Sequence, residues 1–216
     1  MGKLEGKIGV LLVDDHAVVR AGYRLLLQNS ADVDIIAETD SGEAACRLYA
    51  DRHPDVVVMD LSLPGMGGLE AIRRIIARDP RARVLVFSMH DDLIFVDQAI
   101  NAGARGYITK NSAPNVLIDA IKEVAAGRTY LEAEAAQHLA YRKLRGDDSP
   151  FAALSTREFE IFCYLAEGLS TNDIAERLSL SYKTVANYST QIRNKLNVNT
   201  IADLTRLAIR HGVVEA

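Results

Sequence analysis

Residues 8–16 read IGVLLVDDH, a continuous apolar run that ends in two aspartates and a histidine. A short run of this kind is typical of a strand that is buried on both faces of a parallel sheet. Similar runs follow at 33–37, 56–59, 84–87 and 107–108. Amphipathic stretches with helical spacing accompany them, at 16–28, 42–51, 68–78, 93–102 and 113–126. This alternation predicts an α/β doubly wound fold around a five-stranded parallel sheet.

The chain beyond position 150 has a different pattern, because it contains no strand-like run. Amphipathic blocks lie at 156–167, 171–178, 182–196 and 201–211, and Ser155 with Glu158 has the spacing of a capping box. A helical stretch over 131–144 and a polar, turn-rich segment separate the two patterns. We therefore predict a first domain over 4–128, a partly helical linker over 129–150 and an all-α four-helix domain over 151–216.

The composition excludes several classes of protein. With 49% hydrophobic and 25% charged residues, the chain is typical of a soluble globular protein. It contains no apolar run of the ~20 residues that span a bilayer and no apolar stretch of a signal peptide at its start, so we expect a cytoplasmic protein without a membrane partner. Cys46 and Cys163 lack the spacing of metal ligands and are expected to be core residues.

The charge balance needs a closer look, because a net charge of −4 is unusual for a protein that binds nucleic acid. The acidity lies in the first 150 residues, with 22 Asp and Glu against 18 Lys and Arg, whereas residues 151–216 hold seven of each kind. Within this second part, the block 182–196 carries Lys183, Arg193 and Lys195 and no carboxylate. The distribution of charge therefore leaves nucleic-acid binding by the second domain open.

Acidic side chains follow two of the predicted strands. Asp14 and Asp15 come after the first strand and Asp60 after the third, so the three carboxylates should meet at the carboxyl edge of the sheet. Clustered carboxylates repel one another unless a cation offsets them, and Mg²⁺ prefers such oxygen ligands. An aspartate beside Mg²⁺ can act as a nucleophile toward phosphorus. Lys110, after the fifth strand, could then pair with phosphoryl oxygens, and Ser88 offers a hydroxyl at the end of the fourth.

Each of these residues also has an ordinary structural interpretation when it is considered alone. Asp14 or Asp15 could cap the first helix, Tyr107 could be a half-buried core aromatic, and Lys110 could be a solvated surface charge. The coincidence of five such residues at strand ends favours a functional site. His16 is interpreted as a histidine at a helix start, and we assign it no catalytic role.

This set of residues closely resembles the receiver domain of response regulators. The resemblance extends over about 125 residues and rests on the following residues in this order: Asp14-Asp15, Asp60 followed by Pro64-Gly65, Ser88 and Lys110. It implies that Asp60 is the phosphoacceptor. It also implies Mg²⁺ as cofactor, bound directly by Asp15, Asp60 and the backbone carbonyl of Ser62, and by Asp14 through water.

The same resemblance implies a switch. Ser88 is expected to turn toward the phosphoryl group, and Tyr107 to change its rotamer at the same time. Lys110 is expected to bind the phosphoryl oxygens.

The second domain contains two helical blocks separated by a short turn at 179–181. This arrangement is typical of a helix-turn-helix, whose second helix enters the major groove of DNA. The motifs around it resemble the LuxR-type DNA-binding domain: Leu154-Ser-Thr-Arg-Glu158, Gly168-Leu-Ser-Thr-Asn-Asp-Ile-Ala175, Ser181-Tyr-Lys-Thr-Val185 and Lys195-Leu-Asn-Val198. With the receiver, they identify the chain as similar to the NarL/FixJ family of response regulators. The segments 149–155 and 208–214 resemble its GacA/UvrY branch.

The predicted recognition helix turns Val185, Ile192 and Leu196 toward the core. The opposite face carries the expected DNA contacts, which are Lys183, Thr184, Ala186, Asn187, Thr190 and Lys195. Lys183 and Thr184 are expected to bind phosphates, whereas Asn187 can read adenine and Ala186 can lie against a thymine methyl. Many relatives have Lys and His at the positions of Ala186 and Tyr188, so the target sequence should differ from theirs.

We therefore expect a two-component response regulator rather than an enzyme. A sensor histidine kinase is expected to phosphorylate Asp60, and the phosphorylated chain to bind double-stranded promoter DNA as a homodimer and regulate transcription. A hydrolase with a phosphoaspartate intermediate is one alternative, but Ser62 stands where it would need a second acid/base aspartate. A receiver that only dimerises, with DNA binding independent of phosphate, is another, and a helical bundle that binds a partner is a third.

Overall fold

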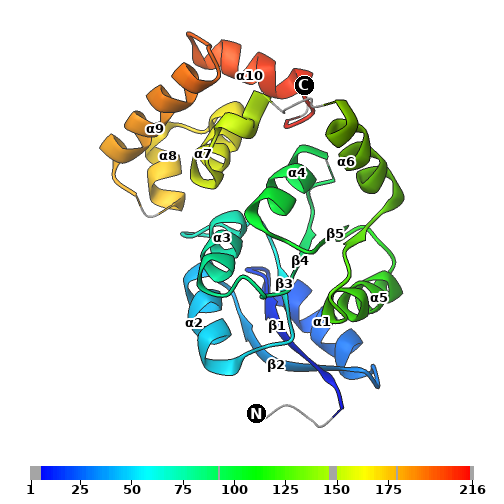
Figure 1. Cartoon of the computed structure of the whole chain (residues 1–216). Helices are drawn as coiled ribbons and strands as arrows, with labels where there is room; N and C mark the ends of the chain where they lie inside the picture. Colours follow the sequence, from blue (N-terminus) through cyan, green and yellow to red (C-terminus); the bar gives the residue numbers. More distant parts are fainter. Residues whose placement is uncertain (1–5, 92, 146–149, 179, 215–216) are drawn as a thin grey trace. The chain divides into compact units, whose positions relative to one another are not determined.

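The structure is a computed structural model, and it describes residues 6–91, 93–145, 150–178 and 180–214 (Figure 1). The described residues form two compact units. The first consists of the chain up to Asp91 together with Ala99–Ala136, and the second of the described parts of 92–98 and 137–216. Positions 4, 5, 92, 146–149, 179 and 215–216 of the predicted domains, linker and turn lie outside the described residues.

The first unit is built on a six-stranded sheet in which all paired strands are parallel. The strands are β1 (Ile8–Val13), β2 (Val33–Thr39), β3 (Val56–Met59), β4 (Val84–Ser88), β5 (Gly106–Thr109) and β6 (Tyr130–Leu131). Their order in the sheet is β2-β1-β3-β4-β5-β6. The predicted parallel α/β sheet is confirmed, but the predicted number of five strands is corrected to six.

The additional strand lies at the edge of the sheet, where the sequence pattern predicts a helix from Leu131. The backbone N–H of Tyr130 instead donates to the carbonyl of Arg105 at 3.0 Å, and Tyr130 lies opposite Gly106. A Cβ atom at Gly106 would lie only 2.9 Å from the Tyr130 carbonyl oxygen, so the glycine permits this close approach. Pairing with β5 thus delays the next helix to Ala133.

Helices cover both faces of the sheet (Figure 1). Those of the first unit are α1 (Ala17–Gln28), α2 (Gly42–Arg52), α3 (Gly68–Arg78) and α5 (Pro114–Ala125), whereas α4 (Leu93–Ala102) and α6 (Ala133–Arg145) are divided between the two units. Helices α1 and α5 pack on one face, where Leu27, Leu117 and Ile121 join Val10 and Val58 of the central strands in one buried cluster. Helix α2 packs on β1 and β2 and against α3. Because both faces are covered, the central strands are apolar throughout, which is why their sequence runs are continuous.

The C-terminal part of the second unit is helical. It contains a 3₁₀ turn (Pro150–Ala153), α7 (Thr156–Ala166), α8 (Thr171–Arg177), α9 (Tyr182–Lys195) and α10 (Ile201–Arg210). Phe151, Phe159 and Phe162 are fully buried and lie in mutual ring contact. The predicted capping box of Ser155 and Glu158 is present at the start of α7. In the part of the chain that the structure describes, no helix has the length and apolar character needed to cross a membrane.

Candidate functional site

The acidic cluster forms where β1 and β3 end. Val13 lies opposite Met59 in the parallel register, and the Asp60 N–H donates to the Val13 carbonyl at 2.9 Å, so Asp14 and Asp60 leave the sheet side by side. Both are only 2% exposed. One ligand atom from each of Asp14, Asp15, His16 and Asp60 can be chosen so that all lie within 4.8 Å of one another. The predicted convergence of three carboxylates is therefore present in the fold.

Lys110 lies between two of these carboxylates. Its Nζ atom is 2.7 Å from Asp14 Oδ2 and 2.6 Å from Asp60 Oδ2, and its side chain is 5% exposed. The Lys110 N–H donates to the Ser88 carbonyl at 2.8 Å, which fixes the residue at the end of β5. Burial lowers the pKa of the Lys110 amine, but the charges and hydrogen bonds of Asp60 and Asp14 outweigh this effect and raise the pKa overall. Lys110 therefore stays charged and compensates one of the three carboxylates.

Asp15 and His16 complete the cluster on its exposed side. Asp15 Oδ1 is buried and has no partner with hydrogen-bond geometry among the described residues, although His16 Nδ1 lies 2.8 Å away. His16 is the N-cap residue of α1, but its side chain makes no capping hydrogen bond there. Instead its backbone N–H donates to Asp14 Oδ1 at 2.8 Å. The helix start thus orients Asp14, while the His16 ring lies beside Asp15.

The loop after Asp60 is held close to the site. The Ser62 N–H donates to Asp60 Oδ1 at 3.3 Å. A Cβ atom at Gly68, the first residue of α3, would overlap with the carbonyl oxygen of Asp60, so only glycine allows the helix to start here. The tight return from Asp60 to α3 keeps the backbone of Ser62 beside the acidic cluster.

Ser88 and Tyr107 are both buried, and both bind the same residue, His90. Ser88 Oγ accepts the His90 N–H at 3.3 Å, and the Tyr107 hydroxyl donates to the His90 carbonyl at 2.7 Å. The His90 ring reaches across to the other loop, with Nε2 3.1 Å from Ser62 Oγ. Burial lowers the pKa of the His90 imidazole, while the charge of Asp60 opposes this shift. Sequence reasoning missed His90, although its position two residues after Ser88 was a signal that could have indicated it.

The face of α9 that the sequence analysis predicts to be outward is largely exposed. Lys183, Asn187 and Thr190 are exposed, whereas Thr184 and Ala186 are partly buried. Val185 and Ile192 are fully buried, as predicted, but Leu196 is only partly buried because it is the C-cap residue. The buried side chains of Val185 and Ile192 thus fix one face of α9 in the core, so that the opposite face is directed toward solvent.

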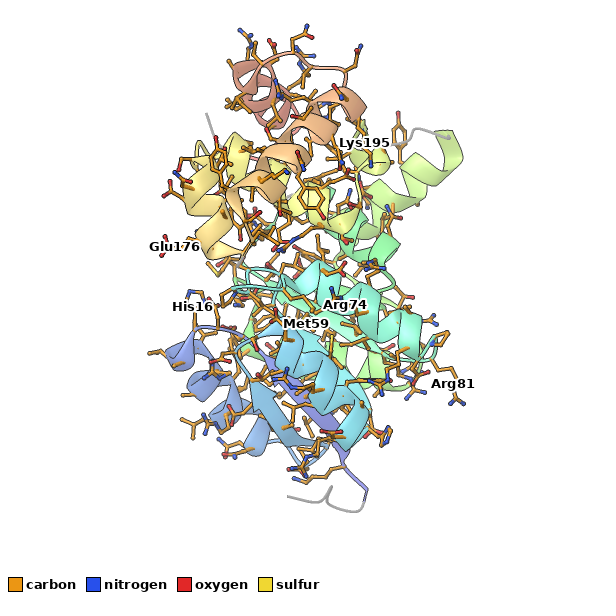
Figure 2. All side chains as sticks on the ribbon, turned by 90° about the vertical axis from the view of Figure 1, so that its left-hand side faces the viewer. His16, Met59, Arg74, Arg81, Glu176 and Lys195 are labelled. Carbon is orange, nitrogen blue, oxygen red and sulfur yellow. The ribbon has the colours of Figure 1, made fainter. Side chains whose placement is uncertain are left out.

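Two of the expected DNA contacts already have partners within the domain. The Thr190 hydroxyl donates to the Ala186 carbonyl at 3.1 Å, which leaves its oxygen able to accept another hydrogen bond. Lys195, labelled in Figure 2, lies at the end of α9 with its Nζ atom 2.6 Å from Glu158 Oε2. Lys195 is therefore tied to α7, unlike the exposed Lys183.

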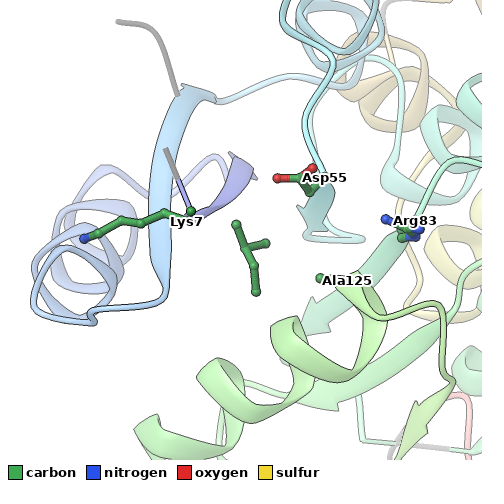
Figure 3. Close-up of a pocket in the computed structure, with 6 residues that line it drawn as sticks. Lys7, Asp55, Arg83 and Ala125 are labelled. Carbon is green, nitrogen blue, oxygen red and sulfur yellow. The ribbon is translucent and has the colours of Figure 1, made fainter. Parts of the chain in front are cut away.

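A hollow at the opposite end of the first unit contains none of the predicted site residues. It is lined by Gly6, Lys7, Ile8, Asp55, Arg83 and Ala125, near the amino ends of β1, β3 and β4 (Figure 3). Asp55 Oδ2 accepts the Gly9 N–H at 2.6 Å, and the Lys7 amine donates to the Ser30 carbonyl at 3.1 Å. Lys7 and Asp55 at this hollow thus have structural partners, and the candidate site remains the acidic cluster.

Two known protein families match separate parts of the chain. Residues 10–122 match the response regulator receiver domain, and residues 152–208 match the luxR family of bacterial regulatory proteins. The chain belongs to the response regulators. It is a two-component response regulator with a receiver and a LuxR-type DNA-binding domain, so the family expected from the sequence is confirmed.

Individual relatives agree with this family over nearly the full length. The response regulator UvrY of Escherichia coli (strain K12) is 39% identical over 211 residues, which cover 97% of either chain. The response regulator GacA of Pseudomonas aeruginosa is 37% identical, with 97% of this chain and 99% of GacA covered. Both are relatives in the branch that the sequence resembles.

Solved structures extend the comparison to the fold. A LuxR-family two-component response regulator from Aurantimonas sp. SI85-9A1 is 43% identical, with 64% of this chain and 99% of that chain covered and a TM-score of 0.60. The response regulator ChrA of a heme-sensing two-component system is 32% identical, with 97% and 100% covered and a TM-score of 0.53. These matches support the receiver fold followed by a helical domain.

Proposed function

We propose that a sensor histidine kinase phosphorylates this response regulator on Asp60 and that the phosphorylated chain binds promoter DNA as a homodimer to control transcription. The observation that carries the proposal is the position of Lys110, 2.6 Å from Asp60 Oδ2 at the carboxyl edge of a parallel sheet. Within this proposal, 4–128 is the receiver, 129–150 the linker, and 151–216 a four-helix DNA-binding domain.

The environment of Asp60 suits a phosphoacceptor. Its carboxylate is 2% exposed, Lys110 binds Oδ2 and the Ser62 N–H binds Oδ1, so its orientation is fixed. When a phosphoryl group is transferred to Asp60, Lys110 can exchange the carboxylate for phosphoryl oxygens without moving far. Catalysis in such a site consists mainly of positioning and of compensating charge.

The cluster also suits Mg²⁺. Among the described residues, Lys110 is the one cation paired to the cluster, so two of the three carboxylate charges of Asp14, Asp15 and Asp60 are not compensated when His16 is neutral. The buried Asp15 Oδ1 without a hydrogen-bond partner is a second indication. Asp15, Asp60 and the Ser62 carbonyl would bind the ion directly, and Asp14 through water. When bound, Mg²⁺ neutralises charge on the transferring phosphoryl group.

Phosphorylation is proposed to shift the receiver between two states. Ser88 and Tyr107 are both hydrogen-bonded to His90, so a turn of Ser88 toward the phosphoryl group breaks one of these bonds and favours a change in the other. This arrangement provides a two-state element that a new charge on Asp60 can bias.

The DNA contacts are proposed on α9. The exposed Lys183 and the helix start at Thr184 are placed for phosphates, and the exposed Asn187 for a base edge. Ala186 and Thr190 complete the surface, and Lys195 would contribute at the far end of the helix. Because residues 151–216 have no net charge, one copy gains little from phosphate contacts. Two copies on neighbouring half-sites would therefore be needed for tight binding.

The enzyme alternative receives little support. A hydrolase with a phosphoaspartate would need an acid/base group in place of Ser62, whereas the Ser62 side chain pairs with His90. The alternative of a receiver that only dimerises does not explain why Lys110 is buried between two carboxylates. Burying these charges costs desolvation free energy, and the buried charges would not contribute to a dimer interface.

Titration with beryllofluoride and Mg²⁺, followed by both molecular mass and DNA affinity, tests the proposal. We expect the full-length chain to dimerise and to bind DNA more tightly, whereas Asp60→Asn should respond in neither assay. Asp51→Asn makes the same chemical change at an exposed position of α2 and should behave like the wild type. Unchanged DNA affinity in a chain that dimerises would favour phosphate-independent DNA binding instead.

A further inference from the structure

Arg20 lies in the first turn of α1 and reaches back to the junction between β1 and that helix. Its Nη1 atom donates to the backbone carbonyl of Asp14 at 2.5 Å, and its side chain is only 18% exposed. A hydrogen bond from a charged donor is shorter and stronger than one between neutral groups. The guanidinium therefore fixes the carbonyl that immediately precedes Asp15 in the chain.

The backbone of Asp14 is bonded to neighbouring elements on both sides. Its N–H donates to the carbonyl of Thr39 at the end of β2, at 3.1 Å, while its own carbonyl accepts from Arg20 on α1. These two bonds restrict the rotation of the peptide that joins Asp14 to Asp15. Because the Asp15 Cα atom belongs to this peptide, the orientation of the peptide determines the direction in which the Asp15 side chain leaves the backbone.

The Asp15 carboxylate depends on its backbone more than the other two carboxylates of the cluster do. Lys110 binds the side chains of Asp14 and Asp60 directly, and among the described residues its ion pairs do not include Asp15. The Asp15 side chain is 30% exposed and lies beside the His16 ring, which is itself 61% exposed. The peptide that Arg20 holds is therefore the main constraint on the position of this carboxylate.

Arg20 is in turn oriented by Glu38 on β2. Glu38 lies opposite Leu12 in the parallel register, and its Oε2 atom is 3.8 Å from Arg20 Nε and 3.3 Å from Arg24 Nη2. This oxygen is buried and has no hydrogen-bond partner among the described residues, so the two guanidinium charges compensate it. Removing one partner of such a buried pair is costly, and the pairing thus keeps Arg20 in one orientation.

We propose that Arg20 is a positioning residue of the acidic cluster: by holding the Asp14 carbonyl it orients Asp15 and thereby sets the affinity of the cluster for Mg²⁺. This inference rests on the proposed function, since it takes Asp15 to be a direct ligand of the ion.

Positioning and charge predict opposite effects when Arg20 is removed. Through its charge alone, Arg20 repels a divalent cation, so its loss would strengthen Mg²⁺ binding. Through the hydrogen bond to the Asp14 carbonyl, Arg20 orients a ligand, so its loss would weaken Mg²⁺ binding. Loss of outer-shell partners that orient metal ligands typically lowers metal affinity about 10- to 100-fold. The direction of the change therefore separates the two roles.

The test titrates Mg²⁺ into the unphosphorylated full-length chain at constant ionic strength and follows binding by NMR. We expect Arg20→Met to raise the dissociation constant for Mg²⁺ about tenfold, the lower end of the range for such partners. Arg20→Lys keeps the charge and a donor for the Asp14 carbonyl, so it should recover part of the affinity. A purely structural role would lower the free energy of unfolding without Mg²⁺ and leave the affinity of the folded chain unchanged.

Arg24→Met is the matched control. It removes the same charge from the same helix, beside the same Glu38, whereas the hydrogen bond to the Asp14 carbonyl comes from Arg20. This variant should bind Mg²⁺ at least as tightly as the wild type. Chemical unfolding without Mg²⁺ shows which variants are folded. If Arg20→Met does not fold, a comparison of Arg20→Lys with Arg24→Lys decides the question, because only the former should then weaken Mg²⁺ binding.

Two results would overturn the positioning role while leaving the proposed site in place. A wild-type or higher affinity in Arg20→Met, with Asp15→Ala binding weakly, would show that Arg20 acts on stability or through its charge alone. Equal losses of affinity in Arg20→Met and Arg24→Met would show that the bond to the Asp14 carbonyl is not the cause. If the wild type binds no Mg²⁺, or Asp15→Ala binds it as tightly as the wild type, the proposed Mg²⁺ site itself is wrong and the inference fails with it.

Discussion

Lys195 Nζ lies 2.6 Å from Glu158 Oε2, although the two residues are 37 positions apart. The same carboxylate oxygen accepts the Ser155 N–H at 2.7 Å, so Glu158 both caps α7 and holds the last turn of α9. Glu158 is 4% exposed, whereas the Lys195 side chain is 41% exposed. One carboxylate thus couples the start of the first helix of the domain to the end of the proposed recognition helix.

This coupling predicts a loss of stability at acidic pH. Burial raises the pKa of Glu158. The hydrogen bonds from Lys195 and Ser155 lower this pKa by more than burial raises it, so the pKa in the folded chain lies below its ordinary value of 4.5. A depressed carboxyl pKa contributes stability above the unfolded value, and this contribution is lost as the pH falls through the folded value. Chemical unfolding of the full-length chain between pH 6 and 3.5 should show the loss below about pH 4.5.

Glu158→Gln provides the comparison for that experiment. The amide keeps the size of the side chain and can accept a hydrogen bond, but it cannot pair with Lys195 as a charge. We expect the free energy of unfolding to fall by about 1 kcal/mol near pH 7, a small loss because the Lys195 side chain is exposed to solvent. The difference between wild type and variant should shrink on acidification, and a constant difference down to pH 3.5 would contradict the role given to the carboxylate.

Lys183 and Lys195 should differ in how their removal affects the salt dependence of DNA binding. Lys183 is exposed near the start of α9, so Lys183→Ala should weaken binding to all sequences about equally and reduce the salt slope by about one. Lys195→Ala should reduce the slope less, because its ammonium is shared with Glu158. Binding isotherms at several salt concentrations measure both slopes, and equal reductions would show that DNA displaces Glu158 from Lys195.

The fold could be predicted largely because buried parallel strands and amphipathic helices leave local patterns. The run from Ile8 to Val13 coincides with β1, since both faces of a central strand are apolar. The two-residue strand β6 left no such pattern, because it depends on pairing with β5 and on the space at Gly106. Elements fixed by partners distant in the sequence are the ones that local reasoning misses.

The candidate site likewise contains features that local sequence patterns predict and features that depend on distant partners. The convergence of Asp14, Asp60 and Lys110 follows from strand order and from the rule that parallel strands end at one edge. The partners of His90 and Lys195 could not be read from spacing, because they lie 28 and 37 positions away on other elements. The predicted roles of the site residues remain predictions that the following experiments test.

Lys110→Met should destabilise the receiver more than an exposed lysine would. The substitution leaves Asp14 and Asp60 buried side by side without their shared cation, and removing one partner of a buried ion pair costs about 3 kcal/mol. Chemical unfolding without divalent cations measures the loss, with Lys183→Ala as the exposed control. Addition of Mg²⁺ should restore more stability to Lys110→Met than to the wild type, and equal effects of Mg²⁺ would argue against an ion at this cluster.

Asp15→Ala should weaken Mg²⁺ binding strongly, because the ion would lose one of its two direct carboxylate ligands. The variant should remain folded, since the Asp15 side chain is 30% exposed and one of its oxygens has no hydrogen-bond partner among the described residues. Titration followed by NMR or fluorescence measures the affinity. Asp51→Asn serves as a control for the change in net charge, and an unchanged Mg²⁺ affinity of Asp15→Ala would exclude Asp15 as a ligand.

Asn187 should determine which base is read at one position of the DNA site. Its side chain is exposed on α9, opposite the buried Val185 and Ile192, and an asparagine amide can pair with both hydrogen-bonding groups of adenine in the major groove. Asn187→Ala should therefore cost about 1–3 kcal/mol at one A·T pair and relax specificity there. Selection from a random DNA library measures the change in the consensus for the full-length chain activated with beryllofluoride. Lys183→Ala is the matched control, since it should weaken binding without altering the consensus. If Asn187→Ala returns the wild-type consensus at the same stringency, α9 enters the groove on a different face from the one that the buried residues define.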